Sequence, residues 1–186
     1  MSEVPAAARS RFVVQPDDSA VLIEARSTAG RIDFGTQAVT GCLEATICDG
    51  MLLLDPPPIA ELEVDLRTLR SGNALYDSEL AQRLDVRRFP RAAVRLGRVQ
   101  RIGDRFQVSG PVTLHGQTCE ITGSVTVRPS AGRWLISGEH VFDIRDFEIA
   151  LPSVLMLRIF PDVRIFMTLA LDPAVDGWAS TMKEEL

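Results

Sequence analysis

The stretch from Arg105 to Arg128 constrains the fold most, because two runs of alternating apolar and polar residues lie on either side of the turn His115-Gly116-Gln117-Thr118. Such alternation is typical of an antiparallel sheet with one face against an apolar interior and the other in water. The stretch therefore predicts a β-hairpin and argues against a buried parallel sheet. Its apolar face comprises Phe106, Val108, Val112, Leu114, Cys119, Ile121, Val125 and Val127.

Alternating runs of the same kind recur along the rest of the chain. With the hairpin they make about eight strands, and most neighbours are separated by short turns, so we expect largely sequential antiparallel pairing. The further strands are expected at 20–26, 39–47, 60–66, 92–100, 134–144 and 162–171.

One segment, at positions 71–89, has a different period, with Tyr76, Leu80 and Leu84 recurring at every fourth residue. This spacing predicts one short amphipathic helix, which Pro90 prevents from continuing. A single helix among eight strands cannot build an α/β sheet, but it can cover an edge or an open end of a barrel. The predicted fold class is all-β: an antiparallel eight-stranded barrel with one short helix packed against it.

The composition is that of one globular domain: 186 residues, 46% hydrophobic and 24% charged. A net charge of -5 argues against nucleic acid as a partner, since affinity for phosphate backbones comes from clustered Lys and Arg. The short cluster Arg87-Arg88-Arg91 is interpreted as a solvated surface, with an anion site as the alternative.

The compartment is predicted from three features. Residues 1–16 contain no apolar run of signal-peptide length, and no window approaches the roughly 20 apolar residues that span a bilayer. The three cysteines fit a reducing compartment and lack the spacings typical of zinc sites. We expect a cytoplasmic protein with at most peripheral membrane contact, no metal and no other cofactor.

The interior of an eight-stranded barrel is either filled by side chains or holds a small ligand. Here Gly41, Gly110, Gly123 and Gly138 fall at inward positions, and aromatic residues total only 6%. Inward glycines either let strands bend at barrel corners or leave space. If several of them leave space together, the barrel is hollow and an apolar ligand is expected.

Three motifs in order complete the pattern: Asp77-x-x-Leu80 with Leu84-Asp85-Val86 and Phe89-Pro90, then the segment 110–118, then the segment 142–149. Together they resemble the YceI-like family of polyisoprenoid-binding proteins, over roughly residues 19–172. Glu148 stands where that family usually has glycine.

The resemblance implies an extended lipocalin-like barrel at residues 11–173, between a flexible amino-terminal tail (1–10) and a polar carboxy-terminal tail (174–186). It also implies an elongated apolar channel. The function expected is non-catalytic binding or carriage of a long-chain apolar ligand: a polyisoprenoid, an isoprenoid quinone or a fatty-acyl amphiphile.

We expect the ligand to contact inward residues of the strands and the apolar segment 151–160, which either packs over the barrel mouth or forms a flap. His140 is interpreted first as a histidine satisfied within the core, with a donor to the ligand head group as the alternative, and it is the best single polar anchor among the candidates. The candidate binding residues are Leu43, Ala45, Phe106, Val108, Val112, Val125, Trp134, His140, Phe142, Phe147, Leu155, Met156, Ile165 and Met167.

Two other classes remain open: a ligand-free interaction module with a filled barrel, and a lipid-modifying enzyme that uses His140. The chain has no Gly-x-Ser-x-Gly, no His-Glu-x-x-His and no phosphate-cradling loop, so no catalytic residue is predicted. Asp143 and Asp146 beside Arg145 are interpreted as a structural ion pair. Exposed strand edges or the segment 151–160 also allow a homodimer.

Overall fold

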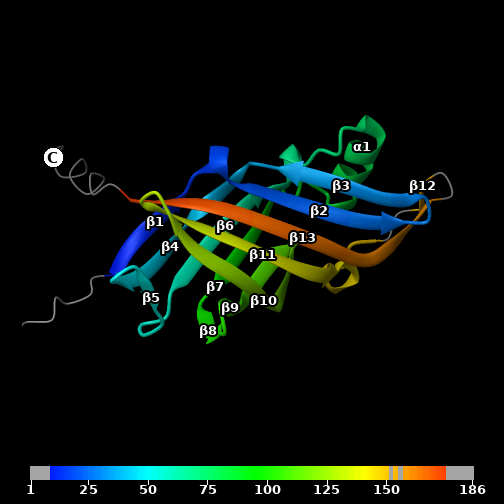
Figure 1. Ribbon diagram of the computed structural model, residues 1–186. Helices are drawn as coiled ribbons and strands as arrows, with labels where there is room; N and C mark the ends of the chain where they lie inside the picture. Colours follow the sequence, from blue (N-terminus) through cyan, green and yellow to red (C-terminus); the bar gives the residue numbers. More distant parts are fainter. Residues whose placement is uncertain (1–8, 151–152, 155–156, 175–186) are drawn as a thin grey trace, which may run out of the picture.

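Eight antiparallel strands close into an elongated barrel in the computed structural model, which describes residues 9–150, 153–154 and 157–174 (Figure 1). Pairing of the first strand with the last closes the barrel, so the predicted fold class is confirmed. The order around the barrel is β1 (Arg9–Val14), β4 (Val39–Cys48), β6 (Ile59–Asp65), β7 (Arg91–Leu96), β9 (Arg105–Leu114), β10 (Gln117–Ser130), β11 (Arg133–Asp143) and β13 (Leu157–Pro173).

A hairpin extends this barrel at one end. Strands β2 (Ala20–Ser27) and β3 (Gly30–Thr36) continue the sheet from β13, and the 3-10 turn Pro16–Asp18 separates β2 from β1. Along its outer edge β3 makes an isolated bridge between Gly35 and Arg70, and it forms no ladder there with another strand of the described residues. The barrel wall is therefore interrupted beside β3.

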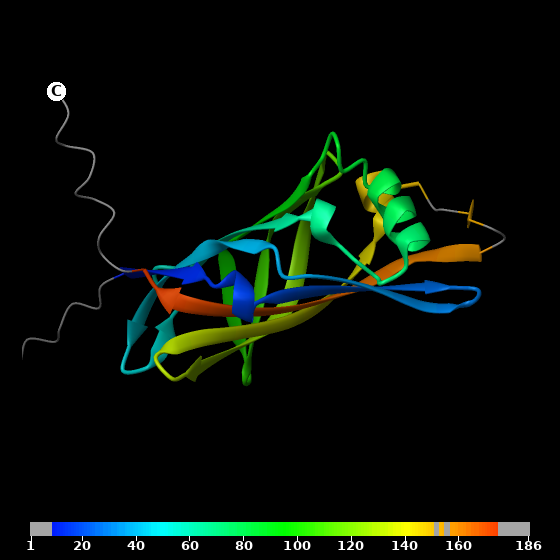
Figure 2. The ribbon, with the colours of Figure 1, turned by 90° about the horizontal axis from the view of Figure 1, so that it is seen from above.

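Helix α1 (Ala74–Arg83) lies at this interrupted end (Figure 2). The Asn73 side chain caps its amino end by accepting hydrogen bonds from two backbone N–H groups of the first turn. Tyr76 and Leu80 pack against a buried cluster that includes Leu66 and Leu84. The predicted helix thus exists, and its apolar stripe covers the open side of the barrel. No helix of the described residues is long and apolar enough to cross a membrane.

The strand pattern differs from the expectation in detail. The run 92–100 is two strands, β7 and β8 (Arg98–Ile102), which Gly97 separates, and β8 pairs with β9 alone. Four strands were not predicted: β1, β3, β5 (Met51–Leu53) and β12 (Ser153–Val154). These are short or polar segments whose extended form depends on the strand beside them.

The inward glycines have different roles. At Gly41 and Gly110 a Cβ would overlap the carbonyl oxygen of the neighbouring strand, at Glu61 and Arg95. These two glycines therefore allow neighbouring strands to approach closely. At Gly123, by contrast, a Cβ would meet a single atom within 4 Å, a ring nitrogen of His140.

Replacing Gly110 by alanine is expected to lower the free energy of unfolding by about 1–3 kcal/mol, because the added methyl group meets backbone atoms of Arg95 and Leu96 that cannot rotate away. Gly97→Ala is the matched control, since a Cβ there would meet no described atom within 4 Å. Urea denaturation of both variants measures the difference. Equal stability of the two variants would contradict close packing at Gly110.

Candidate ligand-binding site

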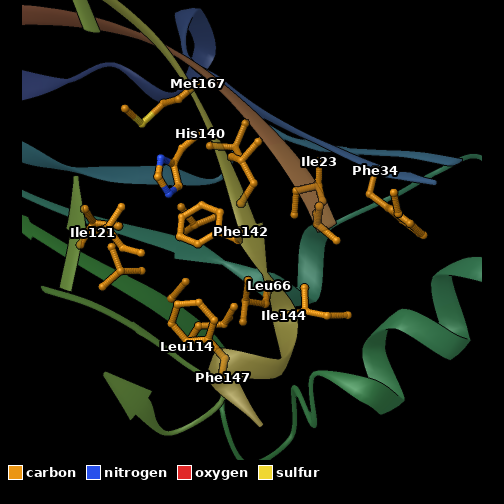
Figure 3. A pocket seen from close by; sticks show the side chains of 18 of the residues that line it. Ile23, Phe34, Leu66, Leu114, Ile121, His140, Phe142, Ile144, Phe147 and Met167 are labelled. Atoms are coloured by element: carbon orange, nitrogen blue, oxygen red, sulfur yellow. The ribbon is translucent and has the colours of Figure 1, made fainter. Parts of the chain in front are cut away.

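An apolar cavity of about 280 Å³ lies inside the barrel at the α1 end (Figure 3). Its walls come from β2, β3, β6, β7, β9, β10, β11 and β13, with α1 and the 3-10 turn η3 (Ile144–Phe147) contributing at one side. A second apolar cavity of about 60 Å³ lies further along the barrel, toward β1 and β4. The described barrel is therefore hollow over part of its length.

Four side chains separate the two cavities and line both of them: Leu96, Val108, Val125 and Met167. Strand β13 runs past both spaces. Its residues Val163 and Ile165 line the large cavity, Met167 is shared, and Leu169 and Leu171 line the small one. The two cavities thus follow one another along β13.

Most of the candidate residues lie around these two spaces. Eight of them line the large cavity: Val108, Val112, Val125, His140, Phe142, Phe147, Ile165 and Met167. Leu43 and Phe106 line the small one. Ala45 and Trp134 line neither, because Ala45 is fully buried in the cluster around Phe12 and Trp134 packs against that cluster. Leu155 and Met156 lie outside the described residues.

The sequence analysis did not include the wall formed by β2, β3 and α1. Ile23 and Phe34 face the large cavity from the hairpin, and Tyr76, Leu80 and Leu84 face it from the helix side. The helical period was visible in the sequence and predicted an apolar stripe. It carried no information on which part of the barrel the stripe covers.

The ionisable groups at the large cavity include an ion pair on α1. Arg83 donates from Nε to Oε1 of Glu79 at 2.7 Å, one turn apart, and both side chains are partly exposed. Each charge therefore has its partner on the helix itself.

His140 is a polar residue of the barrel wall at the large cavity. Its ring meets the Phe142 ring edge-on at a centroid distance of 4.6 Å. No group of the described residues hydrogen-bonds to the His140 ring, whereas the other histidine, His115, contacts the carbonyl oxygen of Phe147 at 3.2 Å. Burial lowers the pKa of His140 below its usual 6.5. The imidazole is therefore neutral at neutral pH and is not satisfied within the described core.

The lowered pKa predicts how stability depends on pH. Below about pH 6.5 His140 binds a proton in the unfolded chain, whereas in the folded chain its lowered pKa disfavours protonation. The free energy of unfolding therefore falls as the pH falls. We expect the protein to lose stability relative to His140→Phe between about pH 7.5 and about pH 5.5. Urea denaturation at both pH values checks this. A difference that stays constant with pH would contradict it.

The three motif segments meet at the α1 end of the barrel. His115 lies in the β9–β10 turn, where its ring meets the Phe89 ring at 5.2 Å and its Nδ1 meets the Phe147 carbonyl oxygen. Gly116 follows in the same turn, and a Cβ there would lie 2.8 Å from the Phe89 ring. Gln117 donates to the Glu148 carboxylate at 2.9 Å. These motif residues hold η3 and the turn together beside the cavity.

The carboxylate of Asp143 forms structural hydrogen bonds with Arg145. It accepts hydrogen bonds from the guanidinium and from the backbone N–H of Arg145. The backbone bond caps η3. The guanidinium bond and the backbone bond together lower the pKa of Asp143 to about 2. The ion pair expected at Arg145 is therefore present, with Asp143 as its partner. Within the described ranges, no group of three or more His, Cys, Asp or Glu side chains is arranged to hold a metal ion.

Several solved structures share this architecture. BcnA of Burkholderia cenocepacia has a TM-score of 0.73 at 15% identity, over 84% of this chain and 98% of that chain. A polyisoprenoid binding domain from Saccharophagus degradans has a TM-score of 0.65 at 14% identity, over 89% and 99%. The YceI protein of Campylobacter jejuni has a TM-score of 0.59 at 11% identity, over 71% and 79%. At such identities these likenesses concern the fold.

Among curated protein sequences, none matches the chain. The model of the YceI-like domain family, however, matches residues 12–171, which is most of the 186-residue chain. The match begins within β1, ends within β13 and spans every strand between them. The chain therefore belongs to the family of YceI-like domains.

Proposed function

We propose that this protein binds a long-chain apolar molecule of the polyisoprenoid type inside its barrel and performs no chemistry on it. The observation that carries the proposal is the cavity of about 280 Å³ in an eight-stranded barrel, with walls built almost wholly from aliphatic and aromatic side chains. A preformed apolar cavity of this kind suits an apolar ligand. The similar fold of a polyisoprenoid binding domain supports the same ligand class.

The arrangement of the two cavities supports an elongated ligand. From Val163 to Leu171 the strand β13 passes along both spaces, a length of about 26 Å at a rise of ~3.3 Å per residue. The partition between them includes Met167, and methionine adapts readily to irregular apolar shapes. A ligand that is longer than the large cavity can therefore extend along β13 toward the small cavity.

Hydrophobic burial alone accounts for useful affinity. Each buried methylene contributes about 0.8 kcal/mol, so roughly fifteen of them contribute about 12 kcal/mol, which offsets an immobilisation cost of about 4 kcal/mol and leaves micromolar binding. No strong polar contact is needed to retain the ligand. Polar groups at the cavity then determine orientation and selectivity.

Binding fits the polar groups better than catalysis does. An acid–base role for His140 calls for a second group that orients the imidazole. Among the described residues no carboxylate hydrogen-bonds or ion-pairs with it, and Asp143, on the same strand, is bonded to Arg145. The filled-barrel alternative is not favoured either, since both cavities lie within the barrel.

Native mass spectrometry of the purified protein, followed by organic extraction and lipid identification, tests the proposal. We expect a discrete added mass that corresponds to an extractable prenyl or acyl lipid. If the mass is unmodified, the delipidated protein is titrated with geranylgeraniol and with a fluorescent fatty-acid probe. Uptake of neither probe would contradict the proposed function and favour a protein partner.

A further inference from the structure

The position of His140 within the large cavity is set by strand register. On β11 it lies between Gly138 and Phe142 on the inward face, and on β13 it is paired with Ile165. Gly138 is paired with Met167, one of the four residues that separate the two cavities. His140 therefore lies at the inner end of the large cavity, one inward position from the partition. Figure 3 shows it between Met167 and Phe142, on the side away from α1.

The surroundings leave Nδ1 of His140 facing open space. The register of β10 and β11 pairs Ser124 with Glu139, and one residue further along it Gly123 lies opposite His140. A residue without a side chain therefore lies opposite the imidazole. A Cβ at Gly123 would lie 3.8 Å from Nδ1 and would meet no other described atom within 4 Å. The edge contact with Phe142 supports the ring from the other side. Nδ1 is thus accessible to a molecule in the cavity.

The charge state of this histidine limits what it binds well. Burial lowers its pKa, so the ring is neutral at neutral pH and offers one N–H donor and one acceptor nitrogen. The charged side chains that line the same cavity include Glu79 and Arg83, which bond to each other on α1. A neutral imidazole in an apolar wall suits an uncharged oxygen and gives no charge to offset a carboxylate or phosphate.

From this placement we propose that His140 is a specificity-determining residue: it hydrogen-bonds an uncharged oxygen of the ligand, a hydroxyl or a carbonyl, at the inner end of the large cavity. The ligand class is then an apolar chain with a neutral oxygen, such as a prenyl alcohol or a quinone, and not a hydrocarbon or an ionised acid. The proposal rests on the proposed function, because it assigns the ligand chemistry of that same site.

The test compares geranylgeraniol with the hydrocarbon of the same skeleton, on the delipidated full chain at neutral pH. The quantity measured is the ratio of the two affinities, because the ratio removes most of the difference due to the apolar chain. In His140→Phe we expect this ratio to fall roughly three- to tenfold relative to the original protein, as for the loss of one hydrogen bond. His140→Gln keeps a donor and an acceptor and is expected to restore much of the ratio.

A spectroscopic measurement separates direct contact from a structural effect. The chain contains only two histidines, so selective ¹⁵N-histidine labelling gives one reporter at the cavity and one, His115, in the β9–β10 turn. Geranylgeraniol is expected to shift the ring nitrogen signals of His140 and to leave those of His115 nearly unchanged. The hydrocarbon is expected to produce a clearly smaller shift at His140.

The outcomes distinguish this inference from the proposed function. Binding of both probes with the same ratio in the original protein and in His140→Phe overturns the role of His140 and leaves the binding function intact. That result would place the oxygen elsewhere, for example near Glu79 and Arg83 on α1. Binding of neither probe overturns the proposed function itself.

Discussion

Gly123→Phe is expected to reduce ligand occupancy at least tenfold while the barrel remains folded. Gly123 lies on β10 and lines the large cavity. A Cβ added there would lie at van der Waals distance from His140 and from no other described residue. Its φ angle lies outside the region that favours glycine, so the backbone accepts a side chain. The phenyl ring therefore fills space where the ligand would lie, and the loss of roughly two to three buried methylenes accounts for a tenfold effect.

The measurement is the fraction of protein that carries extractable lipid, together with the affinity for geranylgeraniol. Thr122→Phe is the matched control, because Thr122 precedes Gly123 on the same strand and its side chain is exposed on the outer face. Gly123→Ala should have an intermediate or small effect. Full occupancy in a folded Gly123→Phe variant would show that the ligand does not occupy this part of the barrel.

Phe147→Ala is expected to lower the free energy of unfolding by about 3–5 kcal/mol, the range for removal of a buried aromatic ring. Phe147 is 1% exposed and belongs to the cluster that joins η3, α1 and the barrel wall. Its ring lies 5.9 Å from the ring of Phe142, and its carbonyl oxygen contacts His115. The loss is therefore expected to loosen the α1 end of the barrel as well.

Phe160→Ala provides the control, because Phe160 is 40% exposed on β13 and the same atoms are removed from a surface position. We expect a change within about 0.5–1 kcal/mol there, which includes the loss of its contact with Arg26. Urea or thermal denaturation of the two variants compares them directly. Similar losses at both positions would mean that the cluster around Phe147 contributes little to stability.

The family motifs form a structural junction that is also part of the wall of the large cavity. Phe89, His115 and Phe147 come from three separated segments and meet at the α1 end of the barrel. Phe147 lines the large cavity, and so do Leu114 and Phe142 from the same motif segments. A sequence comparison that follows these motifs therefore detects the α1 end of the barrel, whereas His140 and Gly123, which also line the large cavity, lie outside the motifs.

Much of the site was predictable because successive side chains of a β-strand point to opposite faces of the sheet. Alternation alone places Val108, Val112, Val125 and Met167 on the inward face, since each residue's face depends only on its neighbours along the same strand. The same reasoning predicted the inward direction of His140. It also predicted one short helix with an apolar stripe, because helical periodicity is equally local.

The tertiary structure decided where each inward residue lies along the barrel. Ala45 and Trp134 have the inward parity of the others, yet they belong to the filled part of the core. Gly110 and Gly123 share that parity too, but one allows close contact between strands and the other leaves space. These differences depend on how strands distant in sequence approach one another, which no local pattern encodes.

The amino-acid sequence by itself therefore determined the all-β class, the faces of the main strands and the existence of the helix. Closure through β1 and β13, the interrupted wall beside β3 and the wall that α1 contributes to the cavity were decided only in three dimensions. The physical reason is that periodicity acts over a few residues, whereas a cavity is the space left when many separated side chains have packed.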